Sequence, residues 1–460
     1  MKVRRSGRAL SLMLASLLVL SACDPFDQAS LPETLGGPGS QTQSAAVDPI
    51  QQGGDTLVRA LTLLRDNYPE GAETGRLVAA GQRGAWYALA QAGIAPQDVD
   101  LPPADASPAD TPPQLRLRYR QIARSYGSKV DPQWLSHEMI RRMAESFGDC
   151  HTGFLSPQQV RDHVNRLQGT TRFGGVGVIL RRDAETGSFA VIEVFDGGPA
   201  AKAGVRRGDL IVSVDGEALQ GLGLEEVVAM VRGQEGAPVR LGVNRAGTPR
   251  EFDVTRGQVS APFIRSGLLT GNVGYLHLYS FPEPLVGQLD QALKEFERRD
   301  VVGVVLDLRD NSGGQLDVVT RVASRFVKSG MLFRTVVPGG DRTVYQADGS
   351  YWRAAKPIAV VVNSGTGSGG EIVASAIQEH GAGWIIGTRS SGCVSTGQMF
   401  PLPDGSALEI ATSRVLTGLQ GAELNKVGVE PDATVHLRVE DLANDRDPQL
   451  ERAAELLLSR

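Results

Sequence analysis

Residues 357–381, PIAVVVNSGTGSGGEIVASAIQEHG, join an apolar run, a glycine-rich turn and an amphipathic segment. The apolar run predicts a strand that is buried on both faces, and the segment from Gly369 onward predicts a helix. Residues 301–314, VVGVVLDLRDNSGG, show another nearly all-apolar run that ends in a glycine-rich turn. Sites in such folds lie where strand ends turn into helices, so the two glycine-rich turns are the places to examine first.

Strands and helices alternate over most of residues 258–440. The expected strands cover 273–281, 301–310 and 357–365, and the expected helices cover 285–300, 316–330 and 369–381. Apolar strands that are followed by helices predict a mixed sheet covered by helices on both faces. The last segment, 441–460, is expected to form a C-terminal helix.

The region before this core divides into two parts of different periodicity. Over 51–167 apolar residues recur at helical spacing, and an Asp-Pro pair at 131–132 is typical of a helix start. Over 168–257 short strands alternate with Gly and Asp turns, apart from one helix expected at 223–233. The sequence therefore predicts an α/β multidomain protein with a helical N-terminal region, an inserted strand-rich domain and an α/β core.

The first 23 residues have the pattern of a lipoprotein signal peptide. Basic residues precede a short apolar stretch, which then runs through LSAC to Cys23. We expect lipidation of Cys23, which would place the protein in a bacterial cell envelope, anchored to a membrane and facing the periplasm or exterior. The alternative is an ordinary signal peptide that is cut near Ala22. Residues 24–50 are polar and rich in Gly, Ser and Pro, as expected for a flexible linker.

Composition narrows the classes of partner. The formal net charge is −5, so no basic excess is available to follow a phosphate backbone, and nucleic acid is not an expected partner. The histidines other than His151 are scattered and show no metal-ligand spacing, so we expect no metal and no cofactor.

Ser368 is the strongest candidate nucleophile in the turn at 363–370. It lies between glycines just before a predicted helix, where a hydroxyl is exposed and negative charge is favoured. The alternative is that Ser368 only caps the helix, as serines often do. Ser364 and Ser375 are the other serines nearby.

The strand-rich domain resembles a PDZ domain in FGGVGV and in GGPAAKAGVRRGDLIVSVDGEAL. Consecutive amides in a glycine-rich loop can hold a peptide's terminal carboxylate, and the adjacent strand edge can accept the peptide as an extra strand. The alternative is a small β-domain with ordinary turns. The resemblance implies that the peptide-binding residues are Phe173, Gly174, Gly175, Val176, Gly177 and Val178.

The two glycine-rich core stretches, together with GVEPDATV, resemble the carboxyl-terminal processing peptidases, serine proteases with an inserted PDZ domain. The resemblance covers about 115–455. It implies that Ser368 is the nucleophile and that the oxyanion is held by the amide of Gly369 and one from Gly313–Gly314.

The chain departs from that family at the general base. The family's usual Gly-Lys-Gly turn corresponds to Gly392-Cys393-Val394, so the lysine is missing, and Gly397 occupies the place of a family glutamine. A Ser–Lys pair would require a distant lysine such as Lys426. Related tricorn-like proteases use a histidine, which makes His151 in GDCHTGFL the expected base. That branch also has an acid before its GV-PD motif, where this chain has Asn425, with Glu423 two residues upstream.

Two of the chain's three cysteines flank these candidates, since Cys150 precedes His151 and Cys393 replaces the lysine. If both motifs reach one site in an exported protein, the two thiols are expected to form a disulfide. The alternatives are two free buried cysteines, or Cys393 acting as a nucleophile.

The resulting prediction is an exported serine endopeptidase that recognises free C-termini of protein or peptide substrates through its PDZ domain. The alternative is an inactive pseudoprotease that binds C-terminal tails without cutting them. The sequence does not predict the oligomeric state.

Overall fold

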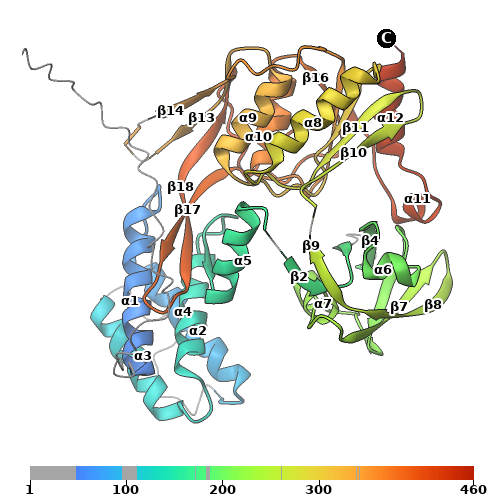
Figure 1. The fold of residues 1–460 in the computed structure, drawn as a ribbon. Helices are drawn as coiled ribbons and strands as arrows, with labels where there is room; N and C mark the ends of the chain where they lie inside the picture. Colours follow the sequence, from blue (N-terminus) through green and yellow to red (C-terminus); the bar gives the residue numbers. More distant parts are fainter. Residues whose placement is uncertain are drawn as a thin grey trace, which may run out of the picture. The chain divides into compact units, whose positions relative to one another are not determined.

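The computed structural model describes residues 48–95, 111–170, 172–182, 187–260, 262–337, 339–340 and 342–459 (Figure 1). The expected signal peptide at 1–23, Cys23 and all but the end of the expected linker at 24–50 lie outside these residues. Among the described helices, none has both the length and the apolar character needed to cross a membrane.

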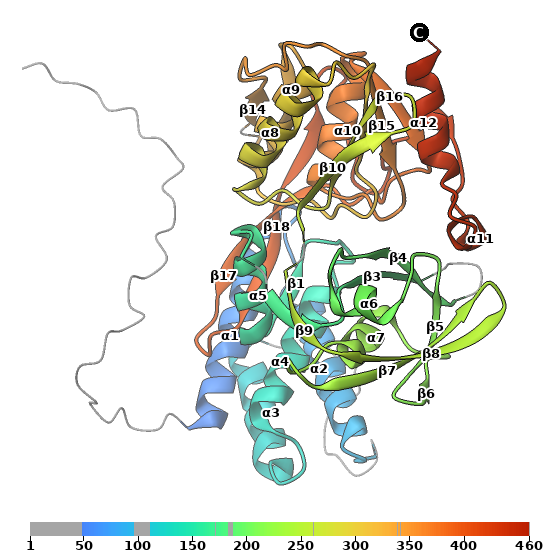
Figure 2. The ribbon, with the colours of Figure 1, turned by 45° about the vertical axis from the view of Figure 1, so that its right-hand side comes forward.

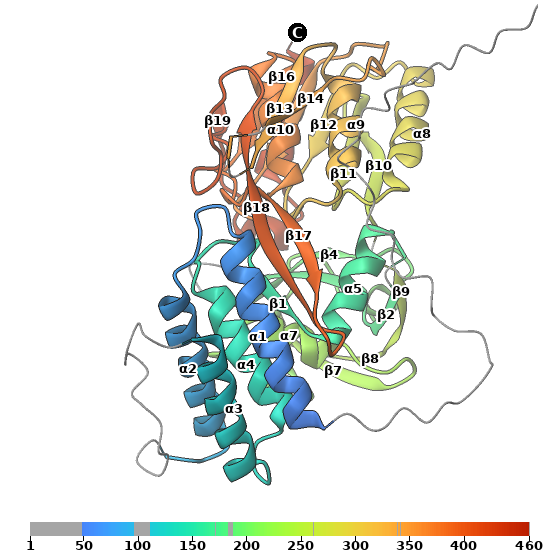
Figure 3. The ribbon, with the colours of Figure 1, turned by 90° about the vertical axis from the view of Figure 1, so that its left-hand side faces the viewer.

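The N-terminal region is helical, and its first four helices pack around one core, whereas the fifth contributes no buried residue (Figure 3). The helices are α1 (Pro49–Asn67), α2 (Thr74–Gln91), α3 (Pro112–Tyr126), α4 (Pro132–Glu145) and α5 (Pro157–Leu167). The expected Asp-Pro start is present at α4, where the Asp131 side chain accepts the Trp134 N–H at 2.8 Å. Gly84 permits close packing of α2 on α4, because a Cβ there would lie 2.4 Å from the Glu138 carbonyl oxygen.

The strand-rich domain contains a six-stranded antiparallel sheet with the order β3-β4-β5-β7-β8, to which β6 adds at β5 (Figure 2). Its strands are β3 (Val178–Arg182), β4 (Phe189–Val194), β5 (Leu210–Val214), β6 (Glu217–Ala218), β7 (Pro238–Arg245) and β8 (Thr248–Thr255). Strands β2 (Arg172–Gly175) and β9 (Gly257–Ser260) form a separate pair, and the helices are α6 (Pro199–Ala203) and α7 (Leu224–Val231). The run FGGVGVILRR is thus two strands, divided near Gly177, where φ is +79°.

The core contains a six-stranded sheet with the order β10-β11-β12-β15-β16-β19, in which only β10 is antiparallel to its neighbour. The strands are β10 (Ile264–Leu269), β11 (Val273–Leu278), β12 (Val304–Asp307), β15 (Ile358–Val362), β16 (Gly383–Gly387) and β19 (Ala433–Thr434). The expected mixed sheet is therefore confirmed.

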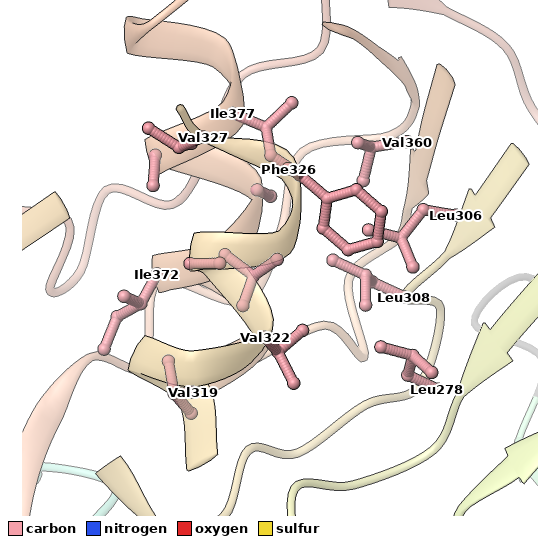
Figure 4. Close-up of a cluster of buried hydrophobic side chains, with 14 of the residues drawn as sticks. Leu278, Leu306, Leu308, Val319, Val322, Phe326, Val327, Val360, Ile372 and Ile377 are labelled. Carbon is pink, nitrogen blue, oxygen red and sulfur yellow. The ribbon is translucent and has the colours of Figure 1, made fainter. Parts of the chain in front are cut away.

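Helices cover both faces of this sheet. One face packs on α8 (Leu285–Arg298), α9 (Leu316–Phe326) and α10 (Gly369–Glu379), and the other packs on α12 (Pro448–Leu458), which follows the short α11 (Val439–Ala443). Figure 4 shows Phe326 of α9 pointing toward Leu306 and Val360 of the sheet. Alternate strand residues face opposite clusters, as expected for strands that are buried on both sides.

A second sheet, which was not predicted, brings distant segments together. It contains β1 (Gly153–Leu155), β13 (Met331–Val336), β14 (Arg342–Gln346), β17 (Ser395–Pro401) and β18 (Ala407–Thr417). The long strand β18 pairs with both β1 and β17. Because β1 begins just after His151 and β17 just after Cys393, β18 fixes these two parts of the chain relative to each other.

Candidate active site

Ser368 lies in the turn between β15 and α10 in a strained backbone conformation, with φ +47° and ψ −116°. A non-glycine residue with positive φ costs free energy, and such residues gather at functional sites. Ser368 occupies the N-cap position of α10, but its side chain makes no capping hydrogen bond to the helix. Of the other serines, Ser364 is exposed, and Ser375 is buried with its hydroxyl donating to the Ile372 carbonyl.

The turn at Gly313–Gly314 packs directly against Ser368. A Cβ on Gly313 would lie 2.9 Å from both the Ser368 hydroxyl oxygen and the Gly369 nitrogen, so only glycine fits there. The Gly313 N–H donates to the Asn311 side chain at 2.8 Å and is already used. Within the described residues, the N–H groups of Gly314 and Gly369 have no acceptor. Gly369 directly follows Ser368, and Gly314 directly follows the glycine that packs against it.

Glu371 on α10 holds the turn that carries Cys393. Its fully buried carboxylate accepts the backbone N–H groups of Gly392 at 2.8 Å and Cys393 at 2.9 Å. It also accepts the hydroxyls of Ser390 and Ser391. The Cys393 carbonyl in turn accepts the Ser368 N–H at 2.8 Å. Glu371 therefore fixes the main chain next to Ser368, a role that sequence reasoning missed.

A disulfide occupies the position of the expected lysine. Cys150 and Cys393 are bonded in the structure, with their Cα atoms 5.9 Å apart. The alternative lysine, Lys426, donates its backbone N–H to the Gly392 carbonyl at 2.6 Å, but its side chain is exposed. Within the described residues, no lysine nitrogen makes a hydrogen bond to Ser368. The bond also excludes Cys393 as a free nucleophile in this state.

His151 lies beside this disulfide, with its Nδ1 3.3 Å from the Cys150 sulfur and 3.7 Å from the Cys393 sulfur. Its Nδ1 is 2.8 Å from the Ser395 hydroxyl oxygen, and its backbone N–H donates to Asp149 at 2.8 Å. Burial lowers the pKa of His151, and the nearby Asp149 carboxylate opposes part of that effect. The imidazole is therefore neutral at neutral pH, as a general base must be.

Ser368 and His151 each contact Cys393 but are not hydrogen-bonded to each other within the described residues. The Cys393 carbonyl accepts the Ser368 N–H, and its Sγ is 3.7 Å from His151 Nδ1. Asn425 stands where the tricorn-like branch has its acid, and Glu423, two residues upstream, pairs with Arg414 at 3.5 Å. The ring partner of His151 is the hydroxyl of Ser395, which sequence reasoning did not consider.

The loop expected to bind peptide lines a cavity of about 710 Å³. Five of the six expected residues line it, namely Phe173, Gly175, Val176, Gly177 and Val178. The exception is Gly174, whose carbonyl accepts the Gly233 N–H at 3.1 Å. Apolar side chains of α7 form part of the lining, and the guanidinium of Arg232 lies 4.5 Å from the Phe173 ring centroid. The same cavity reaches Asp310 and Ser312, directly before the Gly313–Gly314 turn.

Comparisons with known proteins agree with this architecture. Residues 272–435 match peptidase family S41, and residues 191–245 match the PDZ domain family. The chloroplastic C-terminal processing peptidase of Tetradesmus obliquus is 32% identical over 333 residues, which is 69% of this chain and 71% of that protein. The chain belongs to the carboxyl-terminal processing peptidases.

Other members of the family show the same extent of likeness. The carboxy-terminal-processing protease of Bartonella bacilliformis is 32% identical over 69% of this chain and 73% of its own length. The solved photosystem II D1 C-terminal processing protease superposes with a TM-score of 0.54 at 27% identity, over 88% of this chain and 97% of that one. The expected fold class and the expected class of serine-type peptidase are confirmed.

Proposed function

We propose that this carboxyl-terminal processing peptidase is an active serine endopeptidase in which Ser368 is the nucleophile. The observation that carries the proposal is the strained turn of Ser368 beside the unused amides of Gly314 and Gly369. A hydroxyl presented between a strand and a helix, with two amides beside it, is the arrangement that acyl transfer requires. The Ser368 oxygen would attack the scissile carbonyl, and the amides would hold the negative oxygen that forms.

His151 is the proposed general base. It would take the proton from the Ser368 hydroxyl on Nε2, while Nδ1 stays on the Ser395 hydroxyl. The same proton would pass to the leaving amine, and His151 would then activate the water that hydrolyses the acyl-enzyme. A base must come within about 2.6–3.2 Å of the hydroxyl, so the mechanism requires the ring and Ser368 to approach when substrate binds.

The loop at 173–178 is proposed to select substrates by their C-termini. Strand β3 is an edge strand, so it can pair with an extended peptide, while the apolar side chains of α7 can hold the last side chain. Backbone amides of the glycine-rich loop would bind the terminal carboxylate. The edge strand, the apolar side chains of α7 and the loop amides together favour unfolded proteins or peptides with an apolar C-terminal residue as substrates.

Export and membrane anchoring through lipidated Cys23 are also proposed. The support is the signal-peptide pattern of residues 1–23 and the Cys150–Cys393 disulfide, since such bonds persist in oxidising compartments. Replacing Cys23 by Ser should release the protein from the membrane fraction of expressing bacteria. Retention of that variant in the membrane fraction would contradict lipid anchoring.

The second candidate is a tail-binding protein without peptidase activity. It is favoured by one observation, the absence of a hydrogen bond between Ser368 and His151 in the described residues. The two candidates differ in whether bound substrate is cut.

The test incubates the full chain, purified in detergent, with an unfolded protein that has an apolar C-terminus. Wild type, Ser368→Ala and His151→Ala are compared with His163→Ala, a matched control because His163 is also partly buried and its pKa is also lowered by burial. If wild type and His163→Ala cleave the substrate while Ser368→Ala and His151→Ala do not, the Ser–His mechanism is supported. Binding of the tail without cleavage supports the second candidate, and cleavage by Ser368→Ala would contradict the assignment of the nucleophile.

A further inference from the structure

Three potential metal ligands meet at the disulfide. The sulfur atoms of Cys150 and Cys393 and a ring nitrogen of His151 all lie within 4.8 Å of one another. His151 Nδ1 is 3.3 Å from the Cys150 sulfur and 3.7 Å from the Cys393 sulfur. The expected disulfide brings Cys393 beside Cys150 and His151 across 243 positions of sequence.

These distances fit tetrahedral coordination. Zn–S bonds of about 2.3 Å and Zn–N bonds of about 2.0–2.1 Å place sulfur and nitrogen about 3.6 Å apart in a tetrahedron, and two sulfurs about 3.8 Å apart. Both sulfur–nitrogen distances are close to that value. Only the sulfur–sulfur distance is too short, because the two atoms are bonded.

We propose that reduction of the Cys150–Cys393 disulfide creates a Zn²⁺ site made of the two thiolates and His151 Nδ1, with water as the fourth ligand. A dithiol or phosphine reductant supplies two electrons, the S–S bond breaks, and two thiols form with two protons from water. Zn²⁺ then displaces the two thiol protons and binds both sulfurs. Two thiolates and an imidazole are a ligand set that suits zinc.

The main chain at each ligand is held by bonds that do not depend on the disulfide. Asp149 accepts the backbone N–H groups of His151 and Thr152, at 2.8 and 2.6 Å. Glu371 accepts the Cys393 N–H at 2.9 Å, and the Cys393 carbonyl accepts the Ser368 N–H. After reduction the ligands therefore stay near one another, and the sulfurs can separate by side-chain rotation. Cys150 is exposed, which gives the reductant and the metal access.

Zinc at this site would inhibit the peptidase, a consequence that rests on the proposed function. A metal on Nδ1 leaves the proton of the imidazole on Nε2, so His151 has no lone pair with which to accept the Ser368 proton. The disulfide form cannot bind zinc at these sulfurs and would be insensitive to it. The site would thus make zinc inhibition depend on the redox state.

The test counts zinc on the full chain, purified in detergent. Oxidised and phosphine-reduced protein are equilibrated with ZnCl₂, separated from free metal by gel filtration and analysed for zinc per chain. The third cysteine provides a matched control, so reduced Cys23→Ser is compared with reduced Cys393→Ser. Cobalt(II) in place of zinc gives a second readout, because thiolate ligands produce a charge-transfer band.

We expect one zinc per reduced chain, none per oxidised chain, an unchanged count in Cys23→Ser, and a loss in Cys393→Ser. Removal of an outer-shell partner typically lowers metal affinity about 10- to 100-fold, and loss of the Cys393 ligand itself should lower zinc affinity by more than that. Equal zinc content in both redox states of wild type, or a thiolate–cobalt band that survives in Cys393→Ser, overturns the proposal. The wild-type comparison needs no variant to fold. It also needs no peptidase activity, so failure of the proposed function would be seen separately.

Discussion

Replacing Glu371 by Gln should damage the active site although the residue touches no substrate. The Glu371 carboxylate is fully buried and accepts two backbone N–H groups and two hydroxyls from the turn at 390–393. In the amide, one oxygen becomes an NH₂ group, so either the Gly392 or the Cys393 N–H faces a donor. Hydroxyls can rotate to accept from that NH₂, but a backbone N–H cannot.

The size of the effect follows from these bonds. A hydrogen bond to a charged acceptor contributes about 1.5–3 kcal/mol, and a buried donor left without a partner costs about 1–3 kcal/mol. We therefore expect Glu371→Gln to lower the free energy of unfolding by about 3 kcal/mol. Because the displaced Cys393 carbonyl holds the Ser368 N–H, kcat/KM should fall about 100-fold, which corresponds to about 2.7 kcal/mol.

The assay measures cleavage of an unfolded substrate and urea unfolding for Glu371→Gln and for Glu379→Gln. Glu379 is a matched control, because it lies on the same helix and also accepts two backbone N–H groups, from Leu419 and Gln420, but is partly exposed. The control should change both quantities little. If Glu371→Gln keeps wild-type kcat/KM, or if both variants lose the same amount, the carboxylate does not position the nucleophile and the reasoning fails.

Three further predictions concern other parts of the chain. Replacing both Cys150 and Cys393 by Ala removes a link across 243 residues, which should lower the free energy of unfolding by up to about 5 kcal/mol in urea denaturation, and no shift would contradict the chain-entropy argument. Ser368→Gly should raise the free energy of unfolding by about 1 kcal/mol by relieving the positive φ while abolishing cleavage, whereas Ser368→Ala should abolish cleavage without that gain. Burial alone would raise the pKa of Asp404, but hydrogen bonds from His137 and Ser406 outweigh it and hold that pKa well below its ordinary value of about 3.9. As the pH falls, the unfolded chain therefore protonates Asp404 before the folded chain does, so the free energy of unfolding should fall below about pH 4. Melting curves of Asp404→Asn should show a smaller loss of stability over the same pH range.

The sequence predicted the parts of the structure that depend on local pattern. The buried strands β12 and β15 and the helices α9 and α10 follow from apolar runs and helical spacing, which report directly on burial. Ser368 could be placed at the turn between β15 and α10 because a strand, a glycine-rich segment and a helix follow one another in the chain.

The missed features all depend on pairing between distant segments. Strand β18 joins β1 to β17, and no short-range pattern shows which strands of separate regions pair. Glu371 reads as an ordinary acidic residue in the first turn of a helix, and Ser395 as an ordinary residue at the start of a strand. Their roles exist only because the turn at 390–393 folds back onto α10 and His151 reaches β17.

The place of the missing lysine suggests why the nucleophile and its proposed base come from separate sheets. A lysine at position 393 would, as its neutral amine, be able to take the Ser368 proton, so one residue would serve both geometry and proton transfer. Here Cys393 supplies geometry alone, through its carbonyl on the Ser368 N–H and its sulfur beside His151. On the proposed mechanism the position of His151 then depends on the pairing of β1 with β18. The paired residues Gly153 and Glu409 are more than 250 positions apart in sequence. Glu409→Pro disturbs that pairing, so it should reduce cleavage while leaving the Ser368 turn and the binding of a C-terminal peptide unchanged. Loss of cleavage together with loss of peptide binding would contradict the separation of the base from the nucleophile turn.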